Sequence, residues 1–350
     1  MNKFHKLTVS EIQRITPKSV TVSFHIPEAL KEDFQFSAGQ YITIKTTING
    51  EALRRSYSIC TTPQSGLLKV GIKKVDDGLF SRFANNDLRE GDVLEVHPPE
   101  GRFVFLPEKD NKRNLIAFAA GSGITPIMSI MKTALEEEPN SNFVLVYGNK
   151  NATETMFHDE IMELTERYPE RFSLYFIFSR AQEENSLFGR IERANVYHIL
   201  KNKHEGQYFD AFYLCGPEEM INNVTEALQE NKIEKERIFY ELFTASETEA
   251  ETLDLPDGKT SVTVMLDDME YSFIMDKKQR VLDMALKEKL DAPYSCQGGV
   301  CSSCMALLKE GEVNMAKNDI LTDSEVEEGF ILTCQSHPVS DRIIIDYDDI

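Results

Sequence analysis

The sequence lacks a long apolar run, an apolar leader and an excess of basic residues, and each absence excludes a class of protein. None of its 350 residues falls in a stretch of about 18 apolar residues, the length that a membrane-spanning helix needs. The N-terminal Met1-Asn-Lys-Phe-His-Lys has no apolar core of the kind found in secretory signals. The formal net charge of −20 at pH 7 argues against nucleic acid as a partner. We therefore expect a cytoplasmic protein with no membrane span.

Cysteine is also scarce, with six residues in the chain, and four of them form one pattern. Three thiols are spaced C-x4-C-x2-C and a fourth follows after 29 residues; they are Cys296, Cys301, Cys304 and Cys334. This is the spacing of plant-type [2Fe–2S] ligation. A zinc site or a set of small buried thiols is the alternative, although zinc favours paired C-x2-C units and only one such pair occurs here. Thiols in a metal pattern also indicate a reducing compartment.

The acidic residues are concentrated toward the C-terminus. From Ser246 onward the chain has 23 acidic and 9 basic residues, whereas residues 1–245 have 35 and 29. Acidic residues keep a surface soluble, and around a redox centre they also steer a basic partner.

Residues 1–107 have the pattern of an antiparallel β-barrel or sandwich. Short apolar or alternating runs are separated by turn residues, with one helical segment at 78–85. The runs are Lys6–Val9, Ser19–His25, Gln40–Thr46, Arg55–Ile59, Lys69–Lys74 and Val93–Pro98.

Two motifs in this segment suit a flat ring that carries phosphates. In Arg54-Arg55-Ser56-Tyr57-Ser58-Ile59, strand alternation places Arg55, Tyr57 and Ile59 on one face, so a guanidinium lies next to a phenol ring. In Gly78-Leu-Phe-Ser81, glycine opens a helix whose first N–H groups can bind an anion. Taken alone, each motif is also typical of a solvated sheet face or a helix cap.

Residues 108–245 alternate strands and helices, which predicts a doubly wound parallel sheet. The strands are Leu115–Ala119, Phe143–Tyr147, Leu174–Phe178 and Ala211–Cys215, and the helices are Ile127–Glu136, Glu154–Arg167 and Glu218–Asn231. Such sheets bind ligands at the carboxyl ends of their strands.

The four strand ends carry notable residues. Gly121-Ser-Gly-Ile-Thr-Pro126 stands between a strand and a helix, where glycines let a pyrophosphate approach the helix. It is not the G-x-G-x-x-G fingerprint, because Pro126 stands where the last glycine would be. The other strand ends read Tyr147-Gly148-Asn149, Ser179-Arg180 and Cys215-Gly216-Pro217. No acid stands at the end of the third strand to hold a ribose 2′-hydroxyl, and Arg180 suits a 2′-phosphate.

An acidic stretch without periodicity, residues 246–259, predicts a linker to a last domain at 260–350. In that domain we expect a hairpin, a helix, the cysteine loop, a strand, a short helix and a terminal strand. The segments are Ser261–Leu266, Tyr271–Met275, Val281–Glu288, Met305–Glu310, Thr322–Glu328 and Arg342–Asp346. This is the order of an α+β β-grasp ferredoxin.

Taken in order, these motifs resemble the ferredoxin–NADP reductase superfamily, joined to a C-terminal plant-type ferredoxin, over essentially the whole chain. The resemblance implies that Arg55 pairs with a flavin phosphate, that Tyr57 packs on the isoalloxazine and that Ser58 lies near flavin N5. It implies a role at the pyrophosphate for the helix start at Gly78, Phe80 and Ser81, which favours FAD over FMN.

The same resemblance implies roles in the nucleotide domain. The pyrophosphate and nicotinamide would meet Gly121, Gly123, Thr125 and Pro126. The adenosine ribose would face Ser179 and Arg180, which favours NADPH, with NADH possible. Near the nicotinamide and the flavin edge would lie Cys215, Gly216, Glu241 and Phe243, although a buried thiol and a core phenylalanine are the plain alternatives.

The implied activity is that of an NAD(P)H-dependent oxidoreductase, a reductase component that passes electrons from NADPH through FAD to the cluster. Its partner would be an oxygenase, as in the reductases of phenylacetyl-CoA epoxidase systems, or another one-electron metalloprotein. Two alternatives stay open. The same enzyme could run toward NADPH formation, or the chain could be a non-enzymatic iron–sulfur electron carrier.

Overall fold

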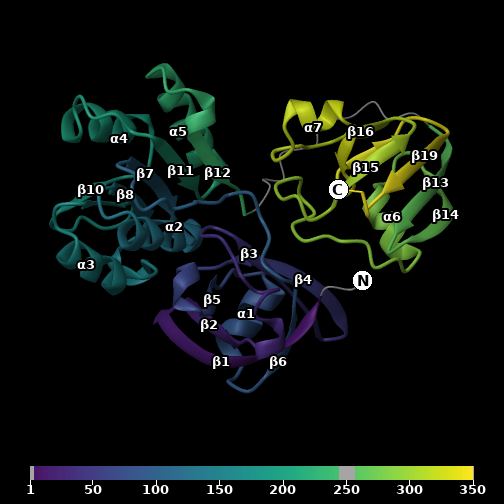
Figure 1. The fold of residues 1–350 in the computed structure, drawn as a ribbon, viewed down its shortest axis with the longest axis horizontal. Coiled ribbons are helices and arrows are strands. Elements are labelled where there is room, and N and C mark those ends of the chain that lie inside the picture. The colour runs from purple at the N-terminus through teal and green to yellow at the C-terminus, as the bar shows by residue number, and fades with distance from the viewer. Residues whose placement is uncertain (1–3, 244–256, 350) are drawn as a thin grey trace. The chain divides into compact units, whose positions relative to one another are not determined.

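The computed structural model describes residues 4–243 and 257–349 (Figure 1). The chain divides into two compact units at the boundary between Leu242 and Phe243, and each is described by itself. Most of the predicted linker, residues 246–256, lies outside the described residues, and the first strand after it begins at Lys259. In the part of the chain that is described, no helix is long and apolar enough to cross a membrane.

The first unit begins with a closed antiparallel barrel. Its six strands run in the order β4-β3-β6-β1-β2-β5, and an isolated bridge between Ile59 and Val70 joins the outer two, which closes the sheet. Their bounds are β1 His5–Thr16, β2 Ser19–His25, β3 Tyr41–Ile48, β4 Glu51–Ser58, β5 Leu68–Lys73 and β6 Val93–Val96. Closure removes the unpaired strand edges that would otherwise invite association. This confirms the predicted antiparallel β-barrel.

Helix α1 (Leu79–Asn86) packs against the core of this barrel. The buried Asn85 amide donates to the Ile72 carbonyl at 3.2 Å and to the Ser81 carbonyl at 2.8 Å, which ties the helix to β5. The start of the helix is thereby held next to the end of that strand.

The second part of the unit is a parallel sheet with the strand order β10-β9-β8-β7-β11-β12. Its strands are β7 Asn114–Ala120, β8 Asn142–Asn149, β9 Phe172–Phe178, β10 Ser186–Phe188, β11 Ala211–Cys215 and β12 Ile238–Glu241. Its helices are α2 Ile124–Glu137, α3 His158–Arg167, α4 Arg193–Tyr197 and α5 Glu218–Glu230. The strand order reverses between β7 and β11, and ligands of such sheets bind at that switch point. The predicted doubly wound fold is confirmed.

Several details of this domain differ from the sequence-based expectations, and two of them have a plain local cause. Strand β10 was not predicted, since three residues are too short to show a period. Helix α3 begins at His158 rather than Glu154, because residues 152–154 form a separate tight turn and Phe157 has a φ of 58°.

Helix α2 belongs to both parts of this unit. One hydrophobic core contains α2, strands of the parallel sheet and barrel residues such as Ala38, Cys60 and Phe103. The Ser129 hydroxyl on α2 donates to the Thr61 carbonyl at 2.6 Å. The barrel and the nucleotide domain therefore share a packed interface along α2.

The second unit is a mixed sheet with the order β14-β13-β19-β15-β17 and a short pair, β16 and β18. Its elements are β13 Lys259–Leu266, β14 Met269–Asp276, α6 Val281–Lys287, β15 Met305–Glu310, β16 Val313–Met315, α7 Asp323–Glu327, β17 Phe330–Leu332, β18 Ser336–Pro338 and β19 Arg342–Asp346. The first hairpin turns at Asp267 and Asp268, which have φ of 55° and 59°, as tight primed turns require. Strands β13 and β19 pair in parallel, whereas β13 with β14 and β19 with β15 are antiparallel pairs. This pairing confirms the β-grasp prediction.

Candidate flavin, nucleotide and cluster sites

The predicted flavin face lies at the end of β4. The Tyr57 ring packs against Phe80 with centroids 5.5 Å apart, and burial raises the pKa of its hydroxyl while the nearby Arg55 charge lowers it. The Arg55 side chain is exposed, so its guanidinium is open to an anion. An aromatic ring beside an exposed cation suits a phosphate-bearing ring system.

At the start of α1 the side chains bond to or pack against other parts of the protein. A Cβ on Gly78 would lie 2.4 Å from the Ser81 hydroxyl oxygen, so glycine is needed there. That hydroxyl donates to the Gly78 carbonyl and accepts the Val75 N–H at 3.1 Å, and Phe80 is buried. What this turn can offer to a pyrophosphate is therefore its backbone N–H groups, which have no partner within a helix.

Three residues that were predicted near the flavin edge come from three strands and lie together. The Ser58 hydroxyl on β4 donates to a Glu241 carboxylate oxygen on β12 at 3.1 Å, across 183 residues of sequence. Glu241 pairs with Cys215 in the ladder between β12 and β11. Burial raises the pKa of Glu241 to about 8, against the lowering effect of the Ser58 hydrogen bond, and burial together with the Glu241 charge raises the pKa of Cys215. The arrangement can hold a proton on the Glu241 carboxyl near neutral pH.

Phe243 is not placed with this group. By its contacts it belongs to the C-terminal unit, and its ring is exposed. Its proposed role beside the flavin stays a prediction.

The glycine turn after β7 lies at the switch point of the sheet. Gly121 has a φ of 56°, and the buried Tyr147 hydroxyl donates to its carbonyl at 2.9 Å. A Cβ on Gly123 would lie 2.0 Å from the Cys215 carbonyl oxygen. The backbone of the turn therefore packs directly against the backbone at the end of β11, with no room for a side chain at position 123. The turn leads directly into α2, whose N-terminus suits a pyrophosphate.

Thr125 and Pro126 complete the predicted turn, Gly216 follows the neighbouring strand β11, and all three contribute mainly to packing. Thr125 is buried, and its hydroxyl donates to the Ser122 carbonyl at 3.0 Å. Its methyl group would lie 2.7 Å from a Cβ on Gly71 of β5, so only glycine lets the barrel approach here. Pro126 is buried, and a Cβ on Gly216 would meet the flexible end of Met220 at 2.8 Å.

The structure adds Lys73, which sequence analysis missed. It ends β5, and its ammonium would lie 3.5 Å from a Cβ on Gly121. Burial lowers its pKa, while the Glu154 carboxylate raises it. The only local sign was the alternation of Lys69, Gly71 and Lys73 on one strand face, which is common on solvated sheets.

Ser179 and Arg180 extend the pairing of β8 and β9 beyond the strands. The Ser179 N–H donates to the Asn149 carbonyl and the Arg180 N–H to the Lys150 carbonyl, each at 2.9 Å. Arg180 is exposed, and Lys150 lies on the neighbouring strand end. On the next strand Phe188 is 60% exposed and pairs with Phe178. The edge thus offers cations and an aromatic ring to a nucleotide.

The four predicted ligand thiols lie in two pairs. The Cys296 and Cys301 sulfurs are 3.1 Å apart, and Cys304 contacts Cys334 through their thiols. Within residues 4–243 and 257–349, no three Cys, His, Asp or Glu side chains converge on a point where one metal ion would be held. Two pairs suit two irons better than a single tetrahedral zinc.

The residues around these thiols donate hydrogen bonds to their sulfur atoms. The Gly298 N–H donates to the Cys296 sulfur at 3.3 Å, and the Gln335 amide donates to the Cys334 sulfur at 3.8 Å. The Cys301 thiol and backbone N–H groups lower the pKa of Cys296 to about 6, against the effect of burial. Gly299 has a φ of 74°, and a Cβ there would lie 2.7 Å from the Lys317 carbonyl oxygen. These residues fit a thiolate-ligated cluster.

Comparison with known proteins agrees with these assignments at the level of domains. An oxidoreductase FAD-binding domain matches residues 6–105, an oxidoreductase NAD-binding domain matches 117–226, and a 2Fe-2S iron-sulfur cluster binding domain matches 264–339. These matches favour FAD, a nicotinamide nucleotide and an iron–sulfur cluster over the zinc and passive-carrier alternatives.

Two curated relatives align along nearly the whole chain. A subunit of the 1,2-phenylacetyl-CoA epoxidase of Escherichia coli K12 is 34% identical, and the alignment covers 99% of both chains. The ferredoxin reductase component of 3-ketosteroid-9-alpha-monooxygenase from Rhodococcus rhodochrous is 31% identical over 97% of this chain and 96% of its own. Among solved structures, phthalate dioxygenase reductase has the same fold, with a TM-score of 0.61, 22% identity and 98% of both chains covered.

Proposed function

Since the chain belongs to the family of FAD-, NAD- and [2Fe–2S]-binding oxidoreductases that includes the related phenylacetyl-CoA epoxidase component of Escherichia coli, we propose that it reduces the oxygenase component of a similar epoxidase. The chain is an NAD(P)H-dependent oxidoreductase. The observation that carries the proposal is the full-length similarity together with the four thiols in two pairs. A different one-electron metalloprotein is the alternative acceptor.

A bound flavin would supply the conversion of the electron pair of a nicotinamide hydride into the single electrons that a [2Fe–2S] cluster requires. The residues of the chain serve this chemistry by binding and orientation. Arg55 neutralises a flavin phosphate, and Tyr57 presents a ring face to the isoalloxazine. The Glu241 carboxyl, hydrogen-bonded to Ser58, holds a proton on its oxygen near neutral pH. Cys215 stays a neutral thiol because burial and the Glu241 charge raise its pKa.

The nucleotide is held by the edge of the parallel sheet. The turn from Gly121 to Gly123 brings backbone N–H groups to the pyrophosphate, and the Lys73 ammonium adds charge from the barrel side. Arg180 takes the 2′-phosphate of NADPH, which is the reason we favour NADPH over NADH.

The cluster is held by the thiolates of Cys296, Cys301, Cys304 and Cys334. The domain limits we propose are 1–107, 108–245 and 260–350. Because thiol ligands persist in reducing surroundings, we also place the protein in the cytoplasm.

Anaerobic stopped-flow reduction with NADPH and with NADH tests the function. Flavin absorbance should bleach first, cluster absorbance should follow, and NADPH should act faster. In Cys334→Ser the first phase should survive, while delivery to the purified oxygenase component of an epoxidase should stop. Protein that carries flavin and cluster but is reduced by neither nucleotide would contradict the proposal.

A further inference from the structure

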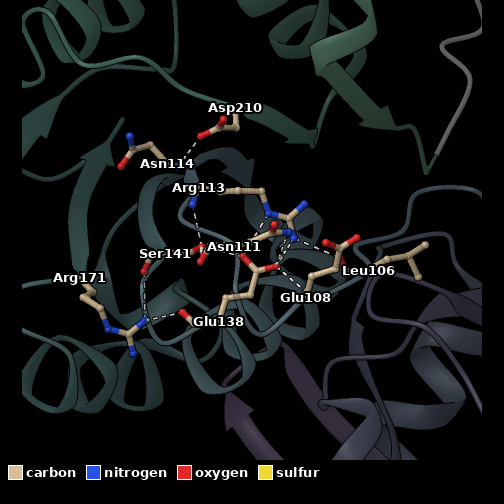
Figure 2. Close-up of polar contacts among 9 residues, drawn as sticks. All are labelled: Leu106, Glu108, Asn111, Arg113, Asn114, Glu138, Ser141, Arg171 and Asp210. Carbon is tan, nitrogen blue, oxygen red and sulfur yellow. Dashed lines mark hydrogen bonds and ion pairs between the residues drawn. The ribbon is translucent and has the colours of Figure 1, made fainter.

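Far from the nucleotide turn, at the other end of α2, one carboxylate is fully buried (Figure 2). Glu138 follows the last residue of the helix. Its oxygens accept the Glu108 N–H at 2.9 Å, the Ser141 hydroxyl at 2.6 Å and the Arg113 Nε at 3.1 Å, and a second Arg113 nitrogen contacts it more closely. None of these residues belongs to the flavin, nucleotide or cluster sites.

Glu108 and Arg113 belong to the segment that connects the barrel to the parallel sheet, whereas Ser141 lies in the turn between α2 and β8. Glu108 and Arg113 lie between the last barrel residues and β7. The barrel anchors this segment in turn, because the Phe105 N–H donates to the Ala38 carbonyl at 2.9 Å and the Arg113 guanidinium lies 4.6 Å from the centre of the Phe105 ring. Glu138 thus fixes the end of α2 to the barrel through the connecting segment.

A second cation secures the same turn. The Arg171 guanidinium, from the start of β9, donates to the carbonyls of Leu135, Glu138 and Ser141 at 2.8–3.0 Å. The C-terminal carbonyls of a helix have no partners within it, and a cation there is favourable. The end of α2 is therefore held from both sides by directional, charged contacts.

The other end of α2 is the nucleotide turn. A helix of 14 residues is about 21 Å long, and it behaves as a rigid rod. Along its length it also packs on the barrel, through Ser129 on Thr61, through Thr125 beside Gly71 and through the shared hydrophobic core. If the C-terminal end of α2 shifted at Glu138, the nucleotide turn at its other end would also be displaced with respect to the barrel that binds the flavin.

Stability alone does not require a charge at this position. Well-packed apolar residues often stabilise an interior as well as a buried ion pair does, whereas charged hydrogen bonds restrict geometry more tightly. Burial tends to raise the pKa of Glu138, but the hydrogen bonds from Arg113, Ser141 and the Glu108 N–H outweigh it and the pKa lies below its ordinary value. The carboxylate stays charged at neutral pH.

We propose that Glu138 is a positioning residue for hydride transfer: it fixes α2 against the connecting segment and so sets the separation between flavin and nicotinamide. This inference rests on the proposed function, because it presupposes hydride transfer between those two groups. Since the turn moves with the helix, loss of the contact should slow the transfer while nucleotide binding to the turn is kept.

The test compares Glu138→Gln with the matched control Asp210→Asn in the full chain. Asp210 accepts the Asn114 N–H at 2.7 Å at the same edge of the sheet, yet has no hydrogen bond with α2 among the described residues (Figure 2). For Glu138→Gln we expect the limiting rate of flavin reduction by NADPH, per bound flavin, to fall about tenfold, because a displacement of about 1 Å can cost up to a hundredfold. The kinetic isotope effect with NADPH deuterated at the transferred position should rise.

Two further measurements separate positioning from a merely structural role. The dissociation constant of NADP⁺ should change less than about twofold, and hydrogen exchange of the 121–127 amides should accelerate in Glu138→Gln but not in Asp210→Asn. A structural role would lower the melting temperature and leave the rate per bound flavin unchanged, since unfolded molecules do not contribute to that rate constant.

A rate in Glu138→Gln within about twofold of that in Asp210→Asn would overturn the inference. If Glu138→Gln does not accumulate, Arg113→Lys replaces it, because lysine keeps the charge but has only one nitrogen for the Glu138 carboxylate, whereas the Arg113 guanidinium uses two, and the same rate criterion applies. If the wild-type protein is reduced by neither nucleotide, the proposed function fails instead, and the two failures are distinct.

Discussion

Gly123→Ala is the substitution whose effect the geometry defines most sharply. The added Cβ would lie 2.0 Å from the Cys215 carbonyl oxygen and 2.8 Å from the Gly216 nitrogen. Carbon–oxygen contacts are ordinarily about 3.3 Å or longer, so the turn and β11 must separate by roughly 1.3 Å. Both partners are backbone in a close-packed interior, which yields little.

The cost follows from that displacement. Overpacking a core costs about 1–3 kcal/mol, and a clash with rigid backbone belongs at the upper end, so we expect a loss of about 3 kcal/mol. For a unit of this size the melting temperature falls by about 2–4 °C per kcal/mol, which gives a decrease of about 6–12 °C. Because the turn itself moves, NADP⁺ should bind at least about tenfold more weakly.

Thermal unfolding followed by near-ultraviolet circular dichroism and NADP⁺ titration measure the two effects. Gly148→Ala is the matched control at the neighbouring strand end. Its Cβ would lie 3.1 Å from the Ile191 side chain, which can rotate away, and 3.7 Å from the Ala120 Cβ, which is an ordinary contact. We expect that variant to lose less than about 1 kcal/mol. If Gly123→Ala melts within about 2 °C of Gly148→Ala and binds NADP⁺ equally well, the close approach of turn and strand is not as described.

Three other substitutions test separate groups. Arg180→Ala should weaken NADPH binding about tenfold with little change for NADH, because only NADPH has the 2′-phosphate; equal losses in titrations with both nucleotides would contradict this. Lys73→Met should weaken both nucleotides by a similar factor, about fivefold, since the pyrophosphate is common to them; a change confined to NADPH would place the ammonium elsewhere. Glu241→Gln should remove a pH dependence of stability. Burial raises the pKa of this carboxyl from 4.5 to about 8, so its contribution is fully present below pH 4.5 and is lost as the pH rises toward 8. Partial exposure limits this loss of stability to on the order of 2 kcal/mol. Urea unfolding at pH 5 and 8.5 should show the loss in the wild type alone. An equal change in the free energy of unfolding between the two pH values in both proteins would refute it.

Local patterns in the sequence determined most of the architecture and the kinds of chemistry. Alternation and apolar runs predicted the barrel, the parallel sheet and the β-grasp domain, because secondary structure follows from the spacing of buried side chains. The cysteine spacing predicted an iron–sulfur cluster, which the matching 2Fe-2S domain supports, and it predicted the four thiols as ligands, since three thiolates from one short loop must follow each other closely in sequence. The glycine turn and Arg180 were predicted to share a nucleotide site because parallel strands bring their carboxyl ends to one edge.

Only the tertiary structure decided which distant residues meet. Ser58 and Glu241 are 183 residues apart, and their contact depends on how the barrel packs against the parallel sheet. Lys73 and Gly71 look like ordinary residues of a strand until that packing places them beside Gly121 and Thr125. Glu138 resembles its exposed neighbour Glu136 in sequence, yet it alone is buried among donors from the connecting segment. A pattern of a few residues fixes a local conformation, whereas contacts between elements depend on the mutual fit of whole surfaces, which no short stretch of sequence contains.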